Sequence, residues 1–266
     1  MAETKIATFN VNSVKSRLPV LESWLSSQEA PEIVCLQETK CRDTEFPVEF
    51  FKQLGYHSTF RGMKSYNGVA VLSRALPDEA EFGLCDEGEE GREESEEARV
   101  IRVRFGDLNL FNTYVPMGKE IDHPDYQYKL RFFSRLRALF EKKAPAGKNL
   151  LWVGDLNVAP TDIDVTHPEN KKKHACFHED VKKALSSVME MGLVDIFRER
   201  LPEEGHFTYW DYRIKDALNR NIGWRLDHII GTPDVASDCE AVTIARELRA
   251  MEKPSDHTAV TAAFNF

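Results

Sequence analysis

Short apolar runs alternate with longer stretches of helical periodicity along the first third of the chain. Residues 5–11 predict a strand, and the fully apolar residues 33–36 predict a second, buried one. Between them, apolar positions three, four and seven residues apart predict a helix over residues 17–27. The pattern begins as strand, helix, strand, which is typical of an α/β protein.

The rest of the chain continues the alternation and adds hairpins. Pro47 opens a predicted helix, and a stripe of aromatic and leucine residues predicts a long helix over residues 125–143. Gly106-Asp107 separates two β-rich runs and predicts a hairpin. The other expected elements are strands over residues 68–72, 100–105, 108–115, 150–154, 222–230, 242–247 and 258–264, and a helix over residues 179–191 ending at Gly192.

This mixture of hairpins and helix-linked strands predicts a layered fold. We expect a four-layer α/β sandwich, in which two packed, mainly antiparallel mixed β-sheets are flanked by helices. The sequence contains no low-complexity linker and no short repeat, so we expect one domain over residues 1–266. Functional residues in such a fold come from loops at one edge of the sandwich.

Composition narrows the class of protein. Hydrophobic residues make up 42% of the chain, which supports a sizeable core, but no run of about 18 apolar residues predicts a membrane span. The first residues form no apolar signal region, so we expect a cytoplasmic protein. The five cysteines are scattered and form no Cys-x-x-Cys pair, which favours reduced thiols over a zinc site.

The net charge of −9 is concentrated in one segment. Residues 86–97 contain eight acidic residues, and the rest of the chain is close to neutral. Bulk charge therefore does not favour nonspecific nucleic-acid binding, although a local basic face remains compatible with the sequence. We interpret the acidic segment as a solvated loop on the face opposite the functional site.

Polar groups stand at strand ends where an ordinary strand does not need them. They occur in five distant segments: residues 9–12, 36–38, 154–157, 224–227 and 253–257. Together these segments supply carboxylates, amides and one histidine. Oxygen ligands suit Mg²⁺, and histidine can stabilise charge on a phosphoryl group, so the set predicts a hard-cation site for phosphate chemistry.

Each residue alone also has a plain structural interpretation. Glu38 has even odds between a salt bridge and a metal ligand, and Asn10 and Asn12 alone are better explained as turn caps. A lone His257 is more often a satisfied core histidine, although Asp227 would be a natural orienting partner for it.

Asp155 and Asn157 indicate a functional site more specifically than Tyr114 does. Asp155 and Asn157 project to the same side of an extended segment, which suits water activation combined with phosphate binding. Tyr114 ends a strand just before a proline, and from this segment alone a plain buried tyrosine is as good an interpretation as a cleft residue.

A later segment mixes aromatic residues with cations. Residues 207–213 read Phe-Thr-Tyr-Trp-Asp-Tyr-Arg, a composition that suits stacking on bases or sugars with contacts to phosphates. Such a cluster is also common in a core with a charged rim. The lysine run at residues 171–173 is usually a solvated loop, and it also suits a backbone phosphate.

Taken together, these segments resemble the exonuclease III family of apurinic/apyrimidinic (AP) endonucleases, within the endonuclease/exonuclease/phosphatase superfamily. The motifs keep the family's order and span nearly the whole chain, which makes the combination specific although each motif alone is weak. They are residues 9–13, 36–40, 66–70, 114–116, 154–160, 210–213, 223–228 and 252–257.

The resemblance implies a divalent-metal phosphodiesterase using Mg²⁺, for which Mn²⁺ would substitute. It makes Glu38 the principal metal ligand, beside Asn10 and Asp256, and makes Asp155 the group that activates the attacking water. Asn157 and Tyr114 would hold the phosphate, and Asp227 would orient His257, which stabilises the phosphoryl oxygen. The full implied metal environment is Asn10, Glu38, Asp155, Asn157, Asp256 and His257, and the implied DNA contacts are Asn67, Lys173, Tyr209, Trp210 and Arg213.

The expected partner is double-stranded DNA with abasic sites or 3′ ends, bound by a monomer. The enzyme would cleave 5′ to an abasic site and also remove nucleotides or blocking groups from 3′ ends. Two alternatives are a superfamily phosphatase acting on inositol phosphates or lipids, and a catalytically idle DNA-binding protein on the same scaffold. The compact length and the segment at residues 210–213 favour DNA, and the complete set of expected active-site residues argues against an idle protein.

The chain departs from the family pattern at four places. Met117 precedes Gly118 where relatives commonly have a polar residue, and Tyr209 stands where several have Trp or Phe. Residues 176–183 lack a common Glu-Arg pair, and the acidic segment is longer than usual. These departures leave open DNA affinity, abasic-site preference and the balance between incision and exonuclease action.

Overall fold

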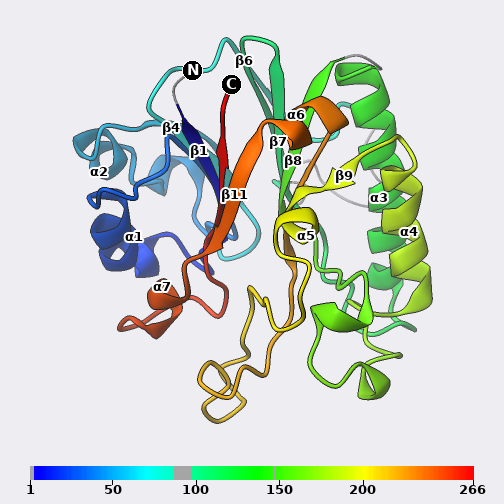
Figure 1. The fold of residues 1–266 in the computed structure, drawn as a ribbon. Helices are drawn as coiled ribbons and strands as arrows, with labels where there is room; N and C mark the ends of the chain where they lie inside the picture. Colours follow the sequence, from blue (N-terminus) through cyan, green and yellow to red (C-terminus); the bar gives the residue numbers. More distant parts are fainter. Residues whose placement is uncertain (1–2, 87–97, 146–147) are drawn as a thin grey trace.

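Two six-stranded mixed sheets form the centre of the computed structural model, which describes residues 3–86, 98–145 and 148–266 (Figure 1). In spatial order the first sheet contains β11 (Cys239–Ile244), β12 (Val260–Phe264), β1 (Thr4–Asn10), β2 (Ile33–Gln37), β4 (Val69–Ser73) and β3 (His57–Arg61). The second contains β5 (Glu79–Phe82), β6 (Val100–Phe105), β7 (Leu108–Tyr114), β8 (Asn149–Asp155), β10 (Asp227–Gly231) and β9 (Val194–Asp195). Within the described residues, each sheet has one parallel pair, β1–β2 or β7–β8, and its other pairs are antiparallel.

Helices cover the outer faces of both sheets (Figure 1). α1 (Leu18–Leu25) and α2 (Val48–Gln53) pack on the first sheet, and α3 (Pro124–Lys143) and α4 (Glu179–Met189) pack on the second. The shorter helices are α5 (Ile196–Arg200), α6 (Pro233–Ser237) and α7 (Arg246–Ala250), with 3₁₀ turns at Lys15–Arg17, Asp43–Glu45, Asp162–Asp164 and Pro168–Asn170. This arrangement confirms the expected four-layer α/β sandwich. Within the described parts of the chain, no helix is both long and apolar enough to span a membrane.

Alternation along the strands explains how the layers hold together. In β1, Ile6 faces the other sheet, whereas Ala7 and Phe9 face the helices. In β8, Val153 faces the first sheet and Trp152 packs under α3. Both sheets are therefore buried on two sides, which is why their central strands read as nearly continuous apolar runs.

Two expected strands have wrong bounds, and the edge strand β3 was missed. The strand predicted over residues 222–230 begins only at Asp227, because the backbone before it pairs with residues 164, 166 and 209 instead of a neighbouring strand. The strand predicted over residues 242–247 ends at Ile244, where the chain turns into α7. The edge strand β3 was not expected, because its residues are only partly buried and show no clear apolar alternation.

Most of the acidic segment lies outside the described residues. Only Asp86 is placed, and its carboxylate accepts hydrogen bonds from Arg135 of α3 at 2.7 and 2.8 Å. The position of residues 87–97 relative to the functional site therefore stays a prediction.

Candidate active site

Inward-facing positions change from apolar to polar as the central strands reach one edge of the sandwich. In β8 the inward series is Leu151, Val153 and then Asp155, and in β1 it runs from Ile6 through Thr8 to Asn10. The register aligns Asp155 with Tyr114 on one side and Asp227 on the other, and aligns Asn10 with Gln37. Strand geometry therefore gathers these polar groups between the two sheets at a single edge.

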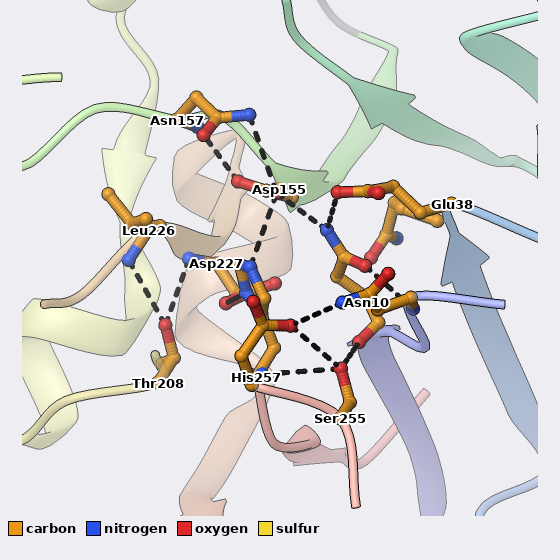
Figure 2. A network of polar contacts seen from close by, with 12 residues as sticks. Asn10, Glu38, Asp155, Asn157, Thr208, Leu226, Asp227, Ser255 and His257 are labelled. Atoms are coloured by element: carbon orange, nitrogen blue, oxygen red, sulfur yellow. Dashed lines mark hydrogen bonds and ion pairs between the residues drawn. The ribbon is translucent and has the colours of Figure 1, made fainter. Parts of the chain in front are cut away.

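Asn10 joins carboxylates that come from the two sheets. Its side-chain amide nitrogen donates hydrogen bonds of 2.8 Å to both Glu38 and Asp155 (Figure 2). Asn10 is completely buried, whereas the Glu38 side chain keeps 17% of its surface exposed. The Glu38 carboxylate thus lies at the mouth of the site, with Asp155 behind it.

His257 is held between two aspartates. Its Nδ1 lies 2.8 Å from Asp227 Oδ2, and its Nε2 lies 3.8 Å from Asp155 Oδ2 (Figure 2). Asp227 is itself positioned by Thr208, whose hydroxyl accepts hydrogen bonds from the Leu226 and Asp227 amides. Asp155, Asp227 and His257 each offer one potential ligand atom, and these three atoms lie within 4.8 Å of one another.

A second group of polar residues borders Glu38. Lys40 Nζ lies 2.6 Å from Glu38 Oε2 and donates to Asn12 Oδ1, and Asn12 Nδ2 donates to Asp256 Oδ1 at 3.0 Å. The Ser255 hydroxyl donates to the Asn10 carbonyl at 2.7 Å, which ties the segment before β12 to the end of β1. Asp256 therefore reaches the same mouth as Glu38, although it comes from the other end of the chain.

Burial and charge set the protonation of the central groups. Burial raises the pKa of Asp155 to about 7, and the neighbouring His257 opposes that rise. Burial alone would lower the pKa of His257, but Asp227 and Asp155 outweigh it and raise that pKa to about 10. Burial likewise opposes the charge on Glu38, yet Lys40 and Asn10 hold its pKa below the ordinary value. The site therefore presents an imidazolium beside a carboxyl group able to exchange a proton near neutral pH.

Tyr114 and Asn157 complete the predicted central set. Burial, reinforced by Glu38, raises the pKa of Tyr114 well above its ordinary value, so its hydroxyl keeps its proton. Asn157 has a left-handed φ of 52°, its amide donates to Asp155 Oδ1 at 2.9 Å, and its side chain donates to the Val115 carbonyl at 2.9 Å. The structure thus brings together Asn10, Glu38, Tyr114, Asp155, Asn157, Asp227, Asp256 and His257.

The residues predicted to contact DNA are placed less uniformly. Tyr209 contacts the centre, with its ring centroid 4.9 Å from that of His257. Asn67 is partly buried, Lys173 is exposed, and the exposed Arg213 pairs with Asp211. Trp210 corrects the prediction, because it is 0% exposed and packs with Phe207 and Ala217, so its ring offers no surface to a nucleotide.

Three positioning groups were missed by the sequence analysis. Thr208 and Ser255 are hydroxyl residues in loops, and nothing in their local sequence distinguishes them from ordinary turn residues. Lys129 is more informative: it is completely buried in α3, three and four residues before the core residues Phe132 and Phe133. A lysine on the apolar stripe of a helix is a sequence signal of a buried charge.

Comparison with known proteins places this geometry in a family. Residues 7–257 match the Endonuclease/Exonuclease/phosphatase family. Exodeoxyribonuclease III of Haemophilus influenzae is 32% identical, over 98% of this chain and 99% of the relative. A solved AP endonuclease from Archaeoglobus fulgidus has a TM-score of 0.93 and 42% identity, covering 99% of this chain and 100% of that chain. The Neisseria 3′ phosphatase NExo, solved with a product DNA hairpin, has a TM-score of 0.91, 33% identity and coverage of 99% and 100%.

The fold and the gathered strand-end residues define a phosphodiester hydrolase of the α/β sandwich type. The chain belongs to the endonuclease/exonuclease/phosphatase family, and within it to the exonuclease III group of AP endonucleases. The family expected from the motifs is confirmed, and the protein is a nuclease.

Proposed function

We propose that this protein is a Mg²⁺-dependent DNA-repair phosphodiesterase that cleaves duplex DNA 5′ to abasic sites and trims blocked 3′ ends. The observation that carries the proposal is the continuous network from Glu38 through Asn10 to Asp155, which lies 3.8 Å from the His257–Asp227 pair. This network combines an oxygen-rich mouth, a proton acceptor and a buried cation, which are the groups that phosphoryl transfer to water requires.

The residues at the mouth fit a hard divalent cation. Glu38 and Asp256 supply carboxylate oxygens, and Asn10 lies beside them, a donor set suited to Mg²⁺. The Lys40 ammonium at 2.6 Å from Glu38 indicates that this carboxylate favours a positive charge. His257 fits a different role, because an imidazolium has no free lone pair for a metal. Bound there, Mg²⁺ would act as a Lewis acid on a phosphoryl oxygen.

Asp155 is the proposed proton acceptor for the attacking water. Its pKa of about 7 matches the task, because a base works best when its pKa lies near the operating pH. As the water oxygen forms its bond to phosphorus, the water's proton passes to Asp155 and the bond from phosphorus to the leaving sugar oxygen breaks. The leaving oxygen keeps the electron pair of that bond and takes up a proton from solvent to become a hydroxyl group. Asn10 keeps the carboxylate oriented through its 2.8 Å hydrogen bond.

Charge that develops on the phosphoryl group meets fixed donors. The His257 imidazolium directs its Nε2–H into the site, while Asp227 fixes the ring through Nδ1. The protonated Tyr114 hydroxyl and the Asn157 side chain are the proposed phosphate contacts. Donors fixed in advance need no reorganisation during the reaction, which is the main source of electrostatic catalysis.

Related structures support DNA as the substrate. The Archaeoglobus relative is described as an AP endonuclease, and the Neisseria relative as a 3′ phosphatase bound to product DNA. In this chain, Tyr209 lies against His257 and Arg213 is exposed farther along the same segment, which supports the proposal that both contact a nucleotide next to the scissile phosphate. An abasic nucleotide lacks stacking, so its sugar leaves the helix at lower cost than an intact nucleotide.

The decisive experiment is cleavage of a duplex that carries one abasic-site analogue. We expect a single cut 5′ to the analogue with Mg²⁺, no cut with excess chelator, and recovery when Mg²⁺ or Mn²⁺ is added back. An intact duplex, a duplex with a 3′-phosphate and an inositol phosphate serve as parallel substrates. Full activity in excess chelator, or faster turnover of the inositol phosphate than of abasic DNA, would contradict the proposal.

A further inference from the structure

A buried ammonium group lies beneath the proposed phosphate site. Lys129 of α3 is 0% exposed, and its Nζ donates to the carbonyls of Met117, Asn157 and Ala175 at 3.1, 2.7 and 2.9 Å. An ammonium has three protons, and each has an acceptor here. Within the described parts of the chain, Lys129 forms no ion pair within 4.0 Å, although the negative charge of Asp155 acts on it from farther away.

Simple stability does not explain this residue. A charge removed from water without a counter-ion is costly, and an apolar side chain of similar length would fill the same space without that cost. The Lys129 charge is stabilised by its carbonyl acceptors, by the Cys176 sulfur at 3.9 Å and by the negative charge of Asp155, but burial outweighs these effects and lowers the pKa of Lys129. The role of the Lys129 ammonium is therefore geometric, because it binds carbonyls from three separate backbone segments and holds them together.

Those segments all approach the site. Met117 follows the end of β7 closely after Tyr114, and Asn157 follows the end of β8 after Asp155. Ala175 precedes Cys176, whose carbonyl accepts a 2.7 Å hydrogen bond from Ala159. Lys129 is thus the common partner of the strand ends that carry the proposed phosphate contacts.

Asn157 needs such a restraint more than its neighbours. Its φ of 52° lies in the left-handed region, which a residue other than glycine adopts only when its surroundings determine it. Its amide and side chain are held by Asp155 and Val115, and its carbonyl is held by Lys129. Without the hydrogen bond from Lys129, the Asn157 carbonyl loses its partner, and the peptide that sets the direction of the Asn157 side chain can rotate.

We infer that Lys129 is a positioning residue for phosphodiester cleavage, and that its ammonium holds Asn157 in the orientation that contacts the phosphate. The inference rests on the proposed function. It assigns Lys129 no contact with DNA, so its loss should slow the chemical step and leave DNA affinity nearly unchanged. A misplacement of about 1 Å at a reacting centre costs on the order of a hundredfold in rate.

A double-mutant cycle tests the inference. Lys129→Met keeps the length of the side chain and removes its donors, and it is combined with Asn157→Ala. We expect Lys129→Met alone to lower the single-turnover rate on abasic duplex at least roughly tenfold, with the dissociation constant within about threefold of wild type. In the Asn157→Ala background, the same change should slow the reaction by less than a third of that factor. A larger factor would show that the lysine acts independently of Asn157 and would overturn the inference.

Controls separate positioning from stability and from the proposed function. Leu139→Ala removes a core side chain of the same helix and should lower stability while keeping the single-turnover rate of the folded protein within about twofold. Lys129→Leu, which also removes the donors, takes the place of Lys129→Met if the latter does not fold. A rate for the Lys129 variant within twofold of wild type overturns the inference, whereas wild-type protein that does not cleave overturns the proposed function instead.

Discussion

At the scale of single residues, the site depends on one carboxyl group with an unusual environment. Asp155 is completely enclosed, and it accepts hydrogen bonds from Asn10 and from the Asn157 amide. Asp155→Asn keeps the shape and one acceptor, but an amide cannot take up a proton from water. We expect single-turnover cleavage to fall at least roughly a hundredfold, with DNA affinity within a few-fold of wild type.

The matched control for that change is Asp107→Asn, in the exposed turn between β6 and β7. It removes the same charge far along the chain from the strand ends of the site, and it should leave the rate unaltered. If Asp155→Asn cleaves at near-normal speed, Asp155 is not the proton acceptor and another group must activate the water.

Trp210 illustrates the opposite case, an apparent functional residue with a packing role. Its side chain is completely buried, and its Nε1 donates to Asn221 Oδ1 at 3.3 Å. Trp210→Ala should therefore lower the free energy of unfolding by about 3–5 kcal/mol, as measured by urea denaturation. The ratio of affinities for abasic and intact duplex should stay constant. Tyr212 is the exposed neighbouring aromatic residue, so Tyr212→Ala should cost far less stability. If Trp210→Ala instead lost its preference for abasic over intact duplex, Trp210 would have a role in recognition.

At the scale of secondary-structure elements, the sequence predicted long and doubly buried elements well. β1, β2, β8 and α3 were found within a residue or two of their predicted bounds, because continuous apolar runs and a long helical stripe leave few alternatives. Short elements were missed, as with β3 and α5, since their residues are held by neighbours that the local sequence does not name. The predicted start of β10 was wrong for the same reason. Residues 222–226 are as apolar as a strand, but their backbone hydrogen bonds go to partners distant in the sequence.

Some residues of the site could likewise be predicted from the sequence, and others could not. Polar residues that end buried strands were readable from the sequence, because burial makes an uncompensated carboxylate or amide costly and therefore informative. The gathering of Asn10, Asp155 and Asp227 depends on strand order and register, which are properties of the whole sheet. Lys129 and Thr208 act through backbone groups of distant segments, and no spacing rule connects them to their partners.

Gly154 lets β7 and β8 approach closely just before Asp155. Its φ is +142°, and a side-chain carbon placed there would lie 1.9 Å from the Thr113 carbonyl oxygen. Gly154→Ala should therefore cost several kcal/mol of stability, because backbone atoms of a central strand must move. Gly192→Ala, also at positive φ but with open space around it, isolates the cost of the dihedral alone. Equal losses in the two variants, measured by thermal or urea unfolding, would contradict the steric explanation.

At the scale of the whole molecule, a buried ionic cluster links loops on the second sheet. Arg225 pairs with Asp164 at 2.6 Å and with Asp195 at 2.8 Å, and its Nη1 lies 3.2 Å from Nδ1 of His228. The other ring nitrogen of His228 lies 2.8 Å from the Val158 carbonyl. Burial, assisted by Arg225, lowers the pKa of His228 from 6.5 to about 4, so the ring is neutral in the folded protein.

This buried ring makes stability sensitive to acid. Between pH 6.5 and 4, His228 is protonated in the unfolded chain but neutral in the folded protein. The contribution of His228 to stability therefore falls as pH falls through that window and is constant above it. From the two pKa values, we expect His228 to remove about 2 kcal/mol of stability between pH 7 and pH 5. Urea unfolding at both pH values measures the change. His228→Gln, which does not titrate, should show a loss smaller by that amount, and identical losses would assign the acid sensitivity to other groups.

The pairing of β1 with β12 has a consequence for biosynthesis. Residues near the start of the sequence must wait for the segment around residues 255–264 before the first sheet is complete and before Ser255 can bind the Asn10 carbonyl. Contacts of such long sequence separation slow folding, because the intervening chain must be ordered before they form. A nascent chain stopped short of residue 257 carries Glu38 and Asp155 but lacks the imidazole beside them. Incomplete translation products are therefore expected to be inert as nucleases.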